Sequence, residues 1–313
     1  MKYIAKKAVT MLVTLLIISA LAFLAFEVIP ADPTTKMLGT EWTAERAAAL
    51  RAELGLDDPL PLRYVRWLGG FFGGDLGTSY SYGVPVKDLL HGKIGITAAL
   101  SLLSFVMVVL ISIPLGLRLA EKAGKTVDKI MTVIGQIMMA IPPFFIGIIF
   151  TSVFGLALRL FVAGKFVSIS ESFWGFWGYL FFPALAIALP KSAMTVKLLR
   201  SSILSELDED YVRTAYSRGH SRKSALRYHV LRNSLMPVIT FLAVTLADIV
   251  AGSIIIEQVF LIPGIGRLLL LAISNRDFPV VLAIVMIIAA LVIFVNFLAD
   301  VVYQVIDPRI RLQ

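Results

Sequence analysis

The 313-residue sequence contains no cysteine and carries little charge. The absence of cysteine excludes a disulfide framework and a thiolate metal site. Charged residues make up 16% of the chain, whereas a soluble domain of ordinary composition has about 25%. Hydrophobic residues make up 58%, and the mean hydropathy is +0.86. This composition predicts a protein whose main solvent is lipid.

Sequence motifs of catalysis are absent too. The chain contains neither His-Glu-x-x-His nor Gly-x-Ser-x-Gly. The glycine-rich segment GGFFGGDLG at 69–77 is no phosphate-binding loop, because none of the three Gly-Lys pairs has a glycine five residues before it. We interpret this segment as an external turn on the membrane surface. We therefore expect no enzymatic activity, no catalytic residue and no nucleotide or other cofactor bound by this chain.

Metal and nucleic-acid binding are not expected either. The three histidines, His91, His220 and His229, are predicted to fall on opposite sides of the membrane. The formal net charge of +8 is better interpreted through its distribution along the chain than as a sign of a nucleic-acid partner.

Six segments are long and apolar enough to cross a membrane, which takes roughly 20 residues. The fold class predicted is an all-α membrane protein with six transmembrane helices. The first segment follows Lys2, Lys6 and Lys7, as in a signal peptide, but its apolar run is too long and VIPADP lacks a cleavage site, so we expect a retained anchor. The six segments are Ala8–Ile29, Ile94–Leu117, Ile130–Leu158, Ser172–Pro190, Ser234–Ile256 and Phe278–Ala299.

The distribution of cations predicts the orientation. One set of alternate segments holds 17 of the 29 Lys and Arg residues and the other holds 11, while Lys191 lies within a span. Short loops rich in Lys and Arg face the cytoplasm. Both termini are therefore predicted to be cytoplasmic. The predicted organisation is a first transmembrane helix at 1–30, an external segment with short helices at 31–93, and a five-helix core at 94–313 with a cytoplasmic loop at 200–233.

The external segment is predicted to contain two helices. Thr43–Leu54 has helix-forming residues with a threonine at its start and Gly55 at its end, which are common helix boundaries. Asp57-Asp58-Pro59 is predicted to form a turn, and Leu62–Phe72 a second, amphipathic helix.

The most distinctive segment is polar and basic and runs from Tyr211 to Pro237. It holds six Lys and Arg residues and no Asp or Glu, and four acids in Glu206–Asp210 precede it. We predict two short helices joined at Gly219, with apolar positions at Val212, Ala215 and Tyr216 in the first, and with the acids at a helix N-terminus. A surface helix held by anionic lipid headgroups remains an alternative.

Several motifs in the same order resemble the B-type permease subunit of the bacterial oligopeptide/dipeptide/nickel ABC importer family. The resemblance covers nearly the whole chain. It rests on ELGLDDPLPLRYVRWL, GDLGTSY, YVRTAYSRGHSRKSALRYHVLRNSLMP, EQVFLIPGIGRLLLLAISNRDFPVV and VNFLADVVYQVIDPRIRL.

The resemblance implies the type I permease fold of an ABC importer in the bacterial cytoplasmic membrane. It implies a second permease subunit, two ATPase subunits that carry ATP and Mg, and an extracytoplasmic substrate-binding protein, with membrane lipid around the permease itself. The basic segment resembles the EAA loop, whose coupling helix docks on the ATPase. Arg213-Thr214-Ala215 stands where that motif has Glu-Ala-Ala, and Gly219 at its glycine. The coupling residues implied are Tyr211, Arg213, Thr214, Ala215, Gly219, His220 and Arg222.

Other residues are candidates for the translocation path. Pro142 and Pro143 interrupt the third span, and Pro183 and Pro190 the fourth, either as packing kinks or beside a water-filled cavity. Asp248 lies mid-span and is predicted to face the subunit interface or the path, whereas Lys191 is predicted to extend to the inner interface.

The outer end of the fifth span supplies one further pair of candidates. We expect two groups of residues at the outer mouth, Glu257-Gln258 and Pro263–Gly266. They could act as a gate, contact the binding protein or form a structural turn.

The function predicted is thus a permease subunit of an ATP-driven importer, for di- or oligopeptides. Nickel complexes, glutathione, sugars or another small solute are alternatives within the family. A secondary transporter would show an inverted repeat, which the two halves lack, and a membrane scaffold or receptor would not need the coupling loop.

Overall fold

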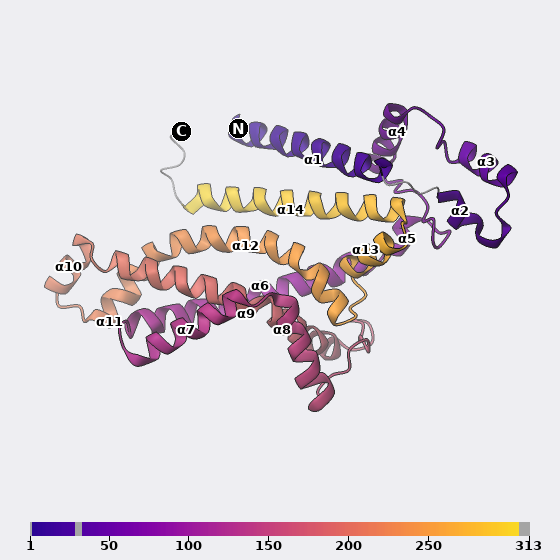
Figure 1. Ribbon diagram of the computed structural model, residues 1–313. Helices are drawn as coiled ribbons and strands as arrows, with labels where there is room; N and C mark the ends of the chain where they lie inside the picture. The colour runs from indigo at the N-terminus through magenta and orange to yellow at the C-terminus, as the bar shows by residue number, and fades with distance from the viewer. Residues whose placement is uncertain (1, 29–32, 307–313) are drawn as a thin grey trace. The chain divides into compact units, whose positions relative to one another are not determined.

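The computed structural model describes residues 2–28 and 33–306, and every regular element in these ranges is helical. Figure 1 labels the helices. The described chain divides into two compact units, Met1–Ile96 with Pro263–Phe294 and Thr97–Ile262 with Val295–Gln313. The end of the last quoted motif, with Arg309 and Arg311, lies outside the described residues. The organisation into 1–30, 31–93 and 94–313 stays a prediction.

The first unit contains the N-terminal anchor, the segment predicted to be external, the helix α13 and the beginning of the last helix, α14. Its elements are α1 (Lys2–Val28), α2 (Pro33–Leu38), the 3-10 turn η1 (Gly39–Glu41), α3 (Ala44–Glu53), α4 (Leu60–Phe72), α5 (Val86–Leu90), α13 (Ile265–Ser274) and the start of α14 (Phe278–Ile306).

The two helices predicted at 43–54 and 62–72 are confirmed as α3 and α4. Thr43 caps α3, since its hydroxyl accepts a hydrogen bond from the Arg46 amide at 3.2 Å. The helix ends before Gly55, whose φ of +63° favours glycine. The short helices α2 and α5 were not predicted, because six and five residues are too few to show a helical period.

A buried carboxylate joins two of the motif segments in this unit. Asp277 is fully buried and accepts hydrogen bonds from the amides of Tyr80 at 3.0 Å and Ser81 at 3.1 Å, and from the hydroxyl of Ser79. The loop after GDLG is thereby fixed to the turn before α14. This long-range contact left no mark in the sequence beyond the two motifs themselves.

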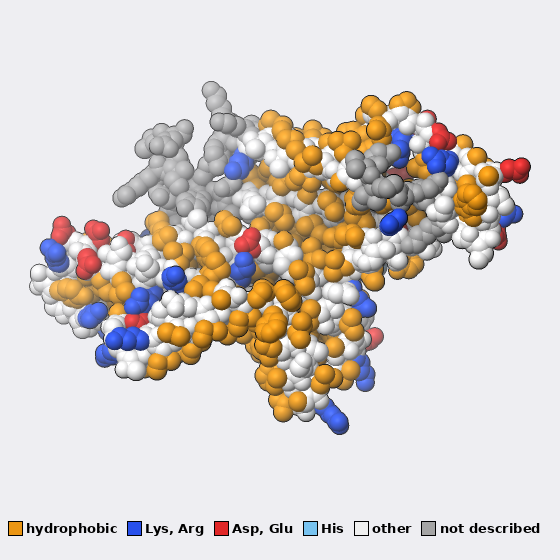
Figure 2. All heavy atoms as spheres, viewed as in Figure 1, with side chains coloured by type: hydrophobic (Ala, Val, Ile, Leu, Met, Phe, Trp, Pro, Cys, Tyr) orange, Lys and Arg blue, Asp and Glu red, His pale blue; other side chains and the backbone are white. Residues whose placement is uncertain are grey.

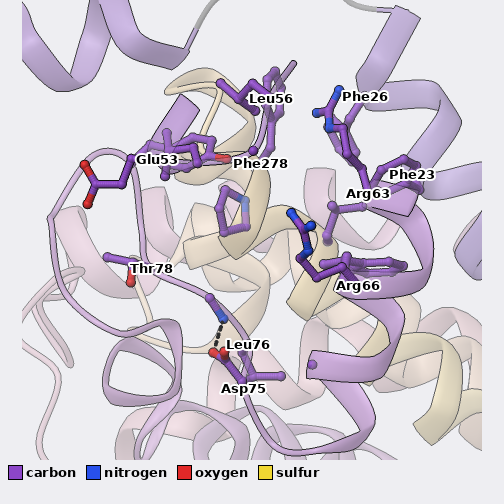
Figure 3. Close-up of a pocket in the computed structure, with 18 of the residues that line it drawn as sticks. Phe23, Phe26, Glu53, Leu56, Arg63, Arg66, Asp75, Leu76, Thr78 and Phe278 are labelled. Carbon is purple, nitrogen blue, oxygen red and sulfur yellow. Dashed lines mark hydrogen bonds between the residues drawn. The ribbon is translucent and has the colours of Figure 1, made fainter. Parts of the chain in front are cut away.

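A cavity of about 660 Å³ lies in the same unit. Figure 3 shows Arg63 and Arg66 of α4 on the same side of it as Phe23 and Phe26 of α1, with Glu53 and Thr78 across the opening. Arg66 also contacts Asp58 at 2.7 Å. The cavity thus combines aromatic walls with charged groups, of which Arg66 is already paired.

The second unit contains the remaining long helices. Its elements are α6 (Lys93–Glu121), α7 (Thr126–Ala140), α8 (Pro143–Phe150), the π-turn η2 (Thr151–Ala157), α9 (Phe173–Glu206), α10 (Asp210–Ser217), α11 (Arg222–Ala225), the π-turn η3 (Leu226–Val230) and α12 (Leu231–Val259). Figure 1 shows α9 and α12 running beside each other, and these two helices pack together most extensively.

Five helices among the described residues are long and apolar enough to span a membrane. The predicted third span, Ile130–Leu158, is instead two helices bent by 99° between α7 and α8, so the total is six only if this pair counts as one span. Pro142 and Pro143 are the cause: Ile141 and Pro142 are extended, as expected for a residue before proline and at the start of a new helix.

The prolines of α9, in contrast to Pro142 and Pro143, do not break their helix. Pro183 and Pro190 are buried inside a single helix of 34 residues, which extends well beyond the predicted end at 190. Polar side chains also pack inside this unit. Arg200 of α9 forms two hydrogen bonds with Asp128 of α7, at 2.6 and 2.7 Å.

Candidate functional site

The basic segment forms a helix, a sharp stop and a second helix. Figure 1 shows α10 and α11 at the shared end of α9 and α12. Asp210 lies in the first turn of α10, after the N-cap Glu209, so the predicted placement of the acids at a helix N-terminus is confirmed. The second helix does not stay separate, because α11 and η3 lead directly into α12.

Gly219 ends α10 in a specific geometry. Its φ is +87°, its amide donates to the Tyr216 carbonyl at 2.9 Å, and the His220 amide donates to the Ala215 carbonyl at 3.2 Å. These two bonds define a Schellman motif, which favours glycine at the left-handed position. The predicted break at Gly219 is confirmed.

A serine starts the second helix. The Ser221 hydroxyl accepts a hydrogen bond from the Ser224 amide at 3.3 Å and caps α11. The chain therefore changes direction over the three residues 219–221, between the end of α10 and the start of α11.

The segment separates an apolar inner face from a charged outer face. Of the three apolar positions predicted in α10, Val212 and Ala215 are buried and Tyr216 is exposed. Tyr228 is 77% exposed. The exposed cations are Arg213, Arg218, Arg222, Lys223, Arg227 and Arg232.

The outer charges make few bonds within the chain. Arg213 lies 3.5 Å from Asp210 in an exposed pair, which contributes little stability. Thr214 donates only to the carbonyl of Asp210, one turn back. Arg213 and its neighbours are therefore available to another protein or to a membrane surface.

Two side-chain bonds fasten the segment to the helices behind it. Tyr211 donates to Glu206 at 2.6 Å, and Arg227 donates to Glu121 of α6 at 3.3 Å. Partial burial raises the pKa of the Tyr211 hydroxyl to about 12, and its bond to Glu206 adds to the shift. Tyr211 therefore stays a hydrogen-bond donor at physiological pH. The sequence did not indicate either bond: Arg227 and Glu121 are 106 residues apart and only the fold brings them together, whereas Tyr211 and Glu206 meet across the short turn between α9 and α10.

The two histidines of this segment meet but form no metal centre. The rings of His220 and His229 lie 5.1 Å apart, and His220 contacts the Ser224 hydroxyl at 3.1 Å. Among the described residues, no group of three or more His, Asp or Glu side chains is arranged to hold a metal ion.

One of the two in-span charges, Lys191, is placed differently from expectation. Lys191 does not extend to the inner interface: its ammonium group contacts the carboxylate of Asp248 at 2.9 Å. Glu257 is fully buried and accepts a hydrogen bond from Thr97 of α6 at 2.5 Å. Glu257 therefore holds α12 to the N-terminal end of α6.

Comparison with known proteins decides the family. The family described as "Binding-protein-dependent transport system inner membrane component" matches residues 112–312, and the one described as "Binding-prot-dependent transport system membrane comp, N-term" matches residues 1–101. The chain belongs to this permease family. It is thus a transport subunit and a multi-pass protein of the bacterial inner membrane, which confirms the family and the membrane location expected from the motifs.

The permease is similar to named relatives along its whole length. It is 33% identical over 309 residues to "Probable peptide ABC transporter permease protein y4tP" of Sinorhizobium fredii, with 99% of each chain covered. It is 34% identical over 312 residues to "Oligopeptide transport system permease protein AppB" of Bacillus subtilis, again with 99% of each chain covered.

Proposed function

We propose that this permease forms, with a second permease subunit, the membrane path of an ATP-driven importer of di- or oligopeptides. Support comes from the peptide permeases that match it from end to end. Two ATPase subunits carry ATP and Mg, and an extracytoplasmic binding protein delivers the peptide. Both termini and the loop at 200–233 lie in the cytoplasm, in keeping with the count of cations.

The observation that carries the mechanism is the geometry of α10 and α11. The helix α10 ends at Gly219 and presents Arg213 and Thr214 outward, while Val212 and Ala215 anchor it from behind. Arg222, at the start of α11, is also exposed. In the proposed function α10 docks on an ATPase subunit. Movement of the ATPase then passes through the bonds of Tyr211 and Arg227 to α9 and α6.

The exposed face of α12 is proposed to line the path. Pro142 and Pro143, at the bend before α8, are proposed to shape it, while the chain's outer apolar surfaces contact lipid. Figure 2 shows hydrophobic side chains over the middle of these helices, with charged ones gathered at the end that carries α10 and α11.

Purification and reconstitution test the proposal. We expect tagged permease to co-purify with two ATPase subunits and a second permease, and this complex with its binding protein to take up labelled tripeptides in liposomes when ATP is supplied. Uptake by the permease alone, without an ATPase, would favour a secondary transporter. Binding of only nickel complexes, glutathione or a sugar by the binding protein would replace the peptide as substrate.

A further inference from the structure

The ion pair of Lys191 and Asp248 is unequally exposed. The two side chains, on α9 and α12, meet at 2.9 Å through Oδ2 of the aspartate. The carboxylate side chain is 57% exposed and the lysine side chain only 21%. The charge that this pair presents outward is therefore negative, while the positive charge is set back behind it.

The pair lies deep within the spans. Asp248 precedes the end of α12 by 11 residues and Lys191 precedes the end of α9 by 15. At 1.5 Å per residue these positions are roughly 16 and 22 Å from the helix ends, beyond the reach of a lysine side chain. An exposed ionised group at this depth is costly in lipid, so ionisable residues there face a bundle interior or a water-filled cavity.

Two further polar groups lie on the exposed face of α12. Exposed positions recur along α12 at helical spacing, and several are polar. This stripe, which we call the α12 face, is Asn233, Pro237, Val244, Asp248, Ala251, Ile255 and Gln258.

The α6 helix of the same unit provides the contrast. Its exposed positions between residues 94 and 114 are all apolar or glycine, as suits contact with lipid or with another apolar helix. They are Ile94, Gly95, Ala98, Leu102, Val106, Leu110 and Pro114. Polar groups at Asn233, Asp248 and Gln258 therefore distinguish the α12 face from the apolar exposed face of α6.

We propose that Asp248 is a transient binding site for the side-chain ammonium group of a lysine-containing peptide in transit. This inference rests on the proposed function, and it specifies the chemical group of the peptide that the site selects. Lys191 holds Oδ2, and the exposed side of the carboxylate remains open to an approaching ammonium group, which forms a charge-assisted hydrogen bond. Because the carboxylate is half in water and its charge is already partly balanced, binding is weak enough for the peptide to leave, as conduction requires.

The test uses the complete complex in liposomes with three tripeptides, Ala-Lys-Ala, Ala-Met-Ala and Ala-Glu-Ala. The affinity of each for the isolated binding protein is measured first, and uptake is divided by occupancy. We expect Asp248→Asn to lower the normalised uptake of Ala-Lys-Ala relative to Ala-Met-Ala by about tenfold, the size of one hydrogen bond to a charged group.

A charge swap separates recognition from structure. The double variant Lys191→Asp with Asp248→Lys keeps an ion pair but exposes a cation, so uptake should shift toward Ala-Glu-Ala. Ile255→Asn, two turns away on the α12 face, is the matched control and should leave the preference of the wild-type complex unchanged.

Three results would overturn the inference. One is an equal loss for all three peptides in Asp248→Asn, which would assign the pair to structure or coupling. Another is wild-type uptake without any preference for lysine. Failure of the wild-type complex to take up any of the peptides would instead remove the proposed function, and this site with it.

Discussion

The buried and the exposed polar groups of the second unit have opposite physical settings. Asp128 with Arg200, and Glu257 with Thr97, lie between packed helices, where each acceptor needs its donor. The outer residues of α10 and α11 lie in the open and make few bonds within the chain. Changes inside should therefore act on stability, and changes outside on docking to a partner.

The largest effect is expected from breaking the buried ion pair. Arg200→Met leaves the Asp128 carboxylate, 4% exposed, without its two charge-assisted bonds. Loss of one partner of a buried pair costs about 3 kcal/mol or more. Detergent unfolding monitored by circular dichroism would measure it. Arg213→Met is the matched control, and an equal loss in both variants would contradict the comparison.

The second-largest loss of stability is expected from Glu257, the buried carboxylate of α12. Glu257→Ala creates a void and leaves the Thr97 hydroxyl without its acceptor, for a cost of about 2 kcal/mol. Asp248→Ala, on the exposed face of the same helix, should change the unfolding midpoint less. Equal shifts of the two midpoints would show that burial does not separate these carboxylates.

Gly219 is exposed, like the outer residues of α10 and α11, but its backbone conformation is constrained, so its substitution should affect both stability and docking. At φ +87° a Gly219→Val substitution meets no neighbouring atom, and the backbone strain alone is about 1–2 kcal/mol. We expect the spans to insert normally while ATP hydrolysis is uncoupled from transport in the complex.

Gly124 supplies the control for this substitution. It has φ +81°, also with open space, but lies in the turn between α6 and α7. Gly124→Val should introduce similar strain without uncoupling. Uncoupling by both variants would attribute the effect to strain rather than to docking.

A smaller effect is expected at Tyr211, which is partly buried. Tyr211→Phe removes the hydrogen bond to Glu206 at 2.6 Å, worth about 1 kcal/mol. The folded-state pKa of about 12 exceeds the ordinary value of about 10. The protonated hydroxyl therefore stabilises the fold below pH ~10, and this contribution is lost as the pH rises toward 12.

Absorbance of tyrosinate checks this shift. The Tyr211→Phe variant should lack one late-titrating tyrosine relative to wild type, and its stability should differ from wild type by a constant amount between pH 6 and 9. A difference that changes within that range would contradict the assignment.

The smallest effect on stability is expected at Arg213. Arg213→Ala removes only an exposed pair with Asp210, so the unfolding midpoint should stay nearly constant. Stimulation of ATP hydrolysis by substrate should fall if this face docks on the ATPase. Unchanged stimulation, with the complex intact, would remove Arg213 from the docking surface.

Local signals explain which parts of the fold were predictable. The Thr43 cap, the stop at Gly219 and the break at Pro142 each depend on the conformational preference of a few adjacent residues, so they could be recognised along the chain. The size of the bend at Pro142 could not, because a proline permits a break without choosing its angle, and Pro183 and Pro190 sit inside a continuous helix.

By itself, the sequence determined that the chain is a helical membrane protein, approximately where its apolar segments run, and where the basic segment turns. Length, hydropathy and residue-specific backbone preference are properties of neighbouring residues. Tertiary structure alone decided that Lys191 pairs with Asp248, that Glu257 is buried against Thr97, and that Asp277 holds the loop at Ser79. Such contacts join residues far apart in the chain, and only the packing of helices brings their charges and hydroxyl groups within bonding distance.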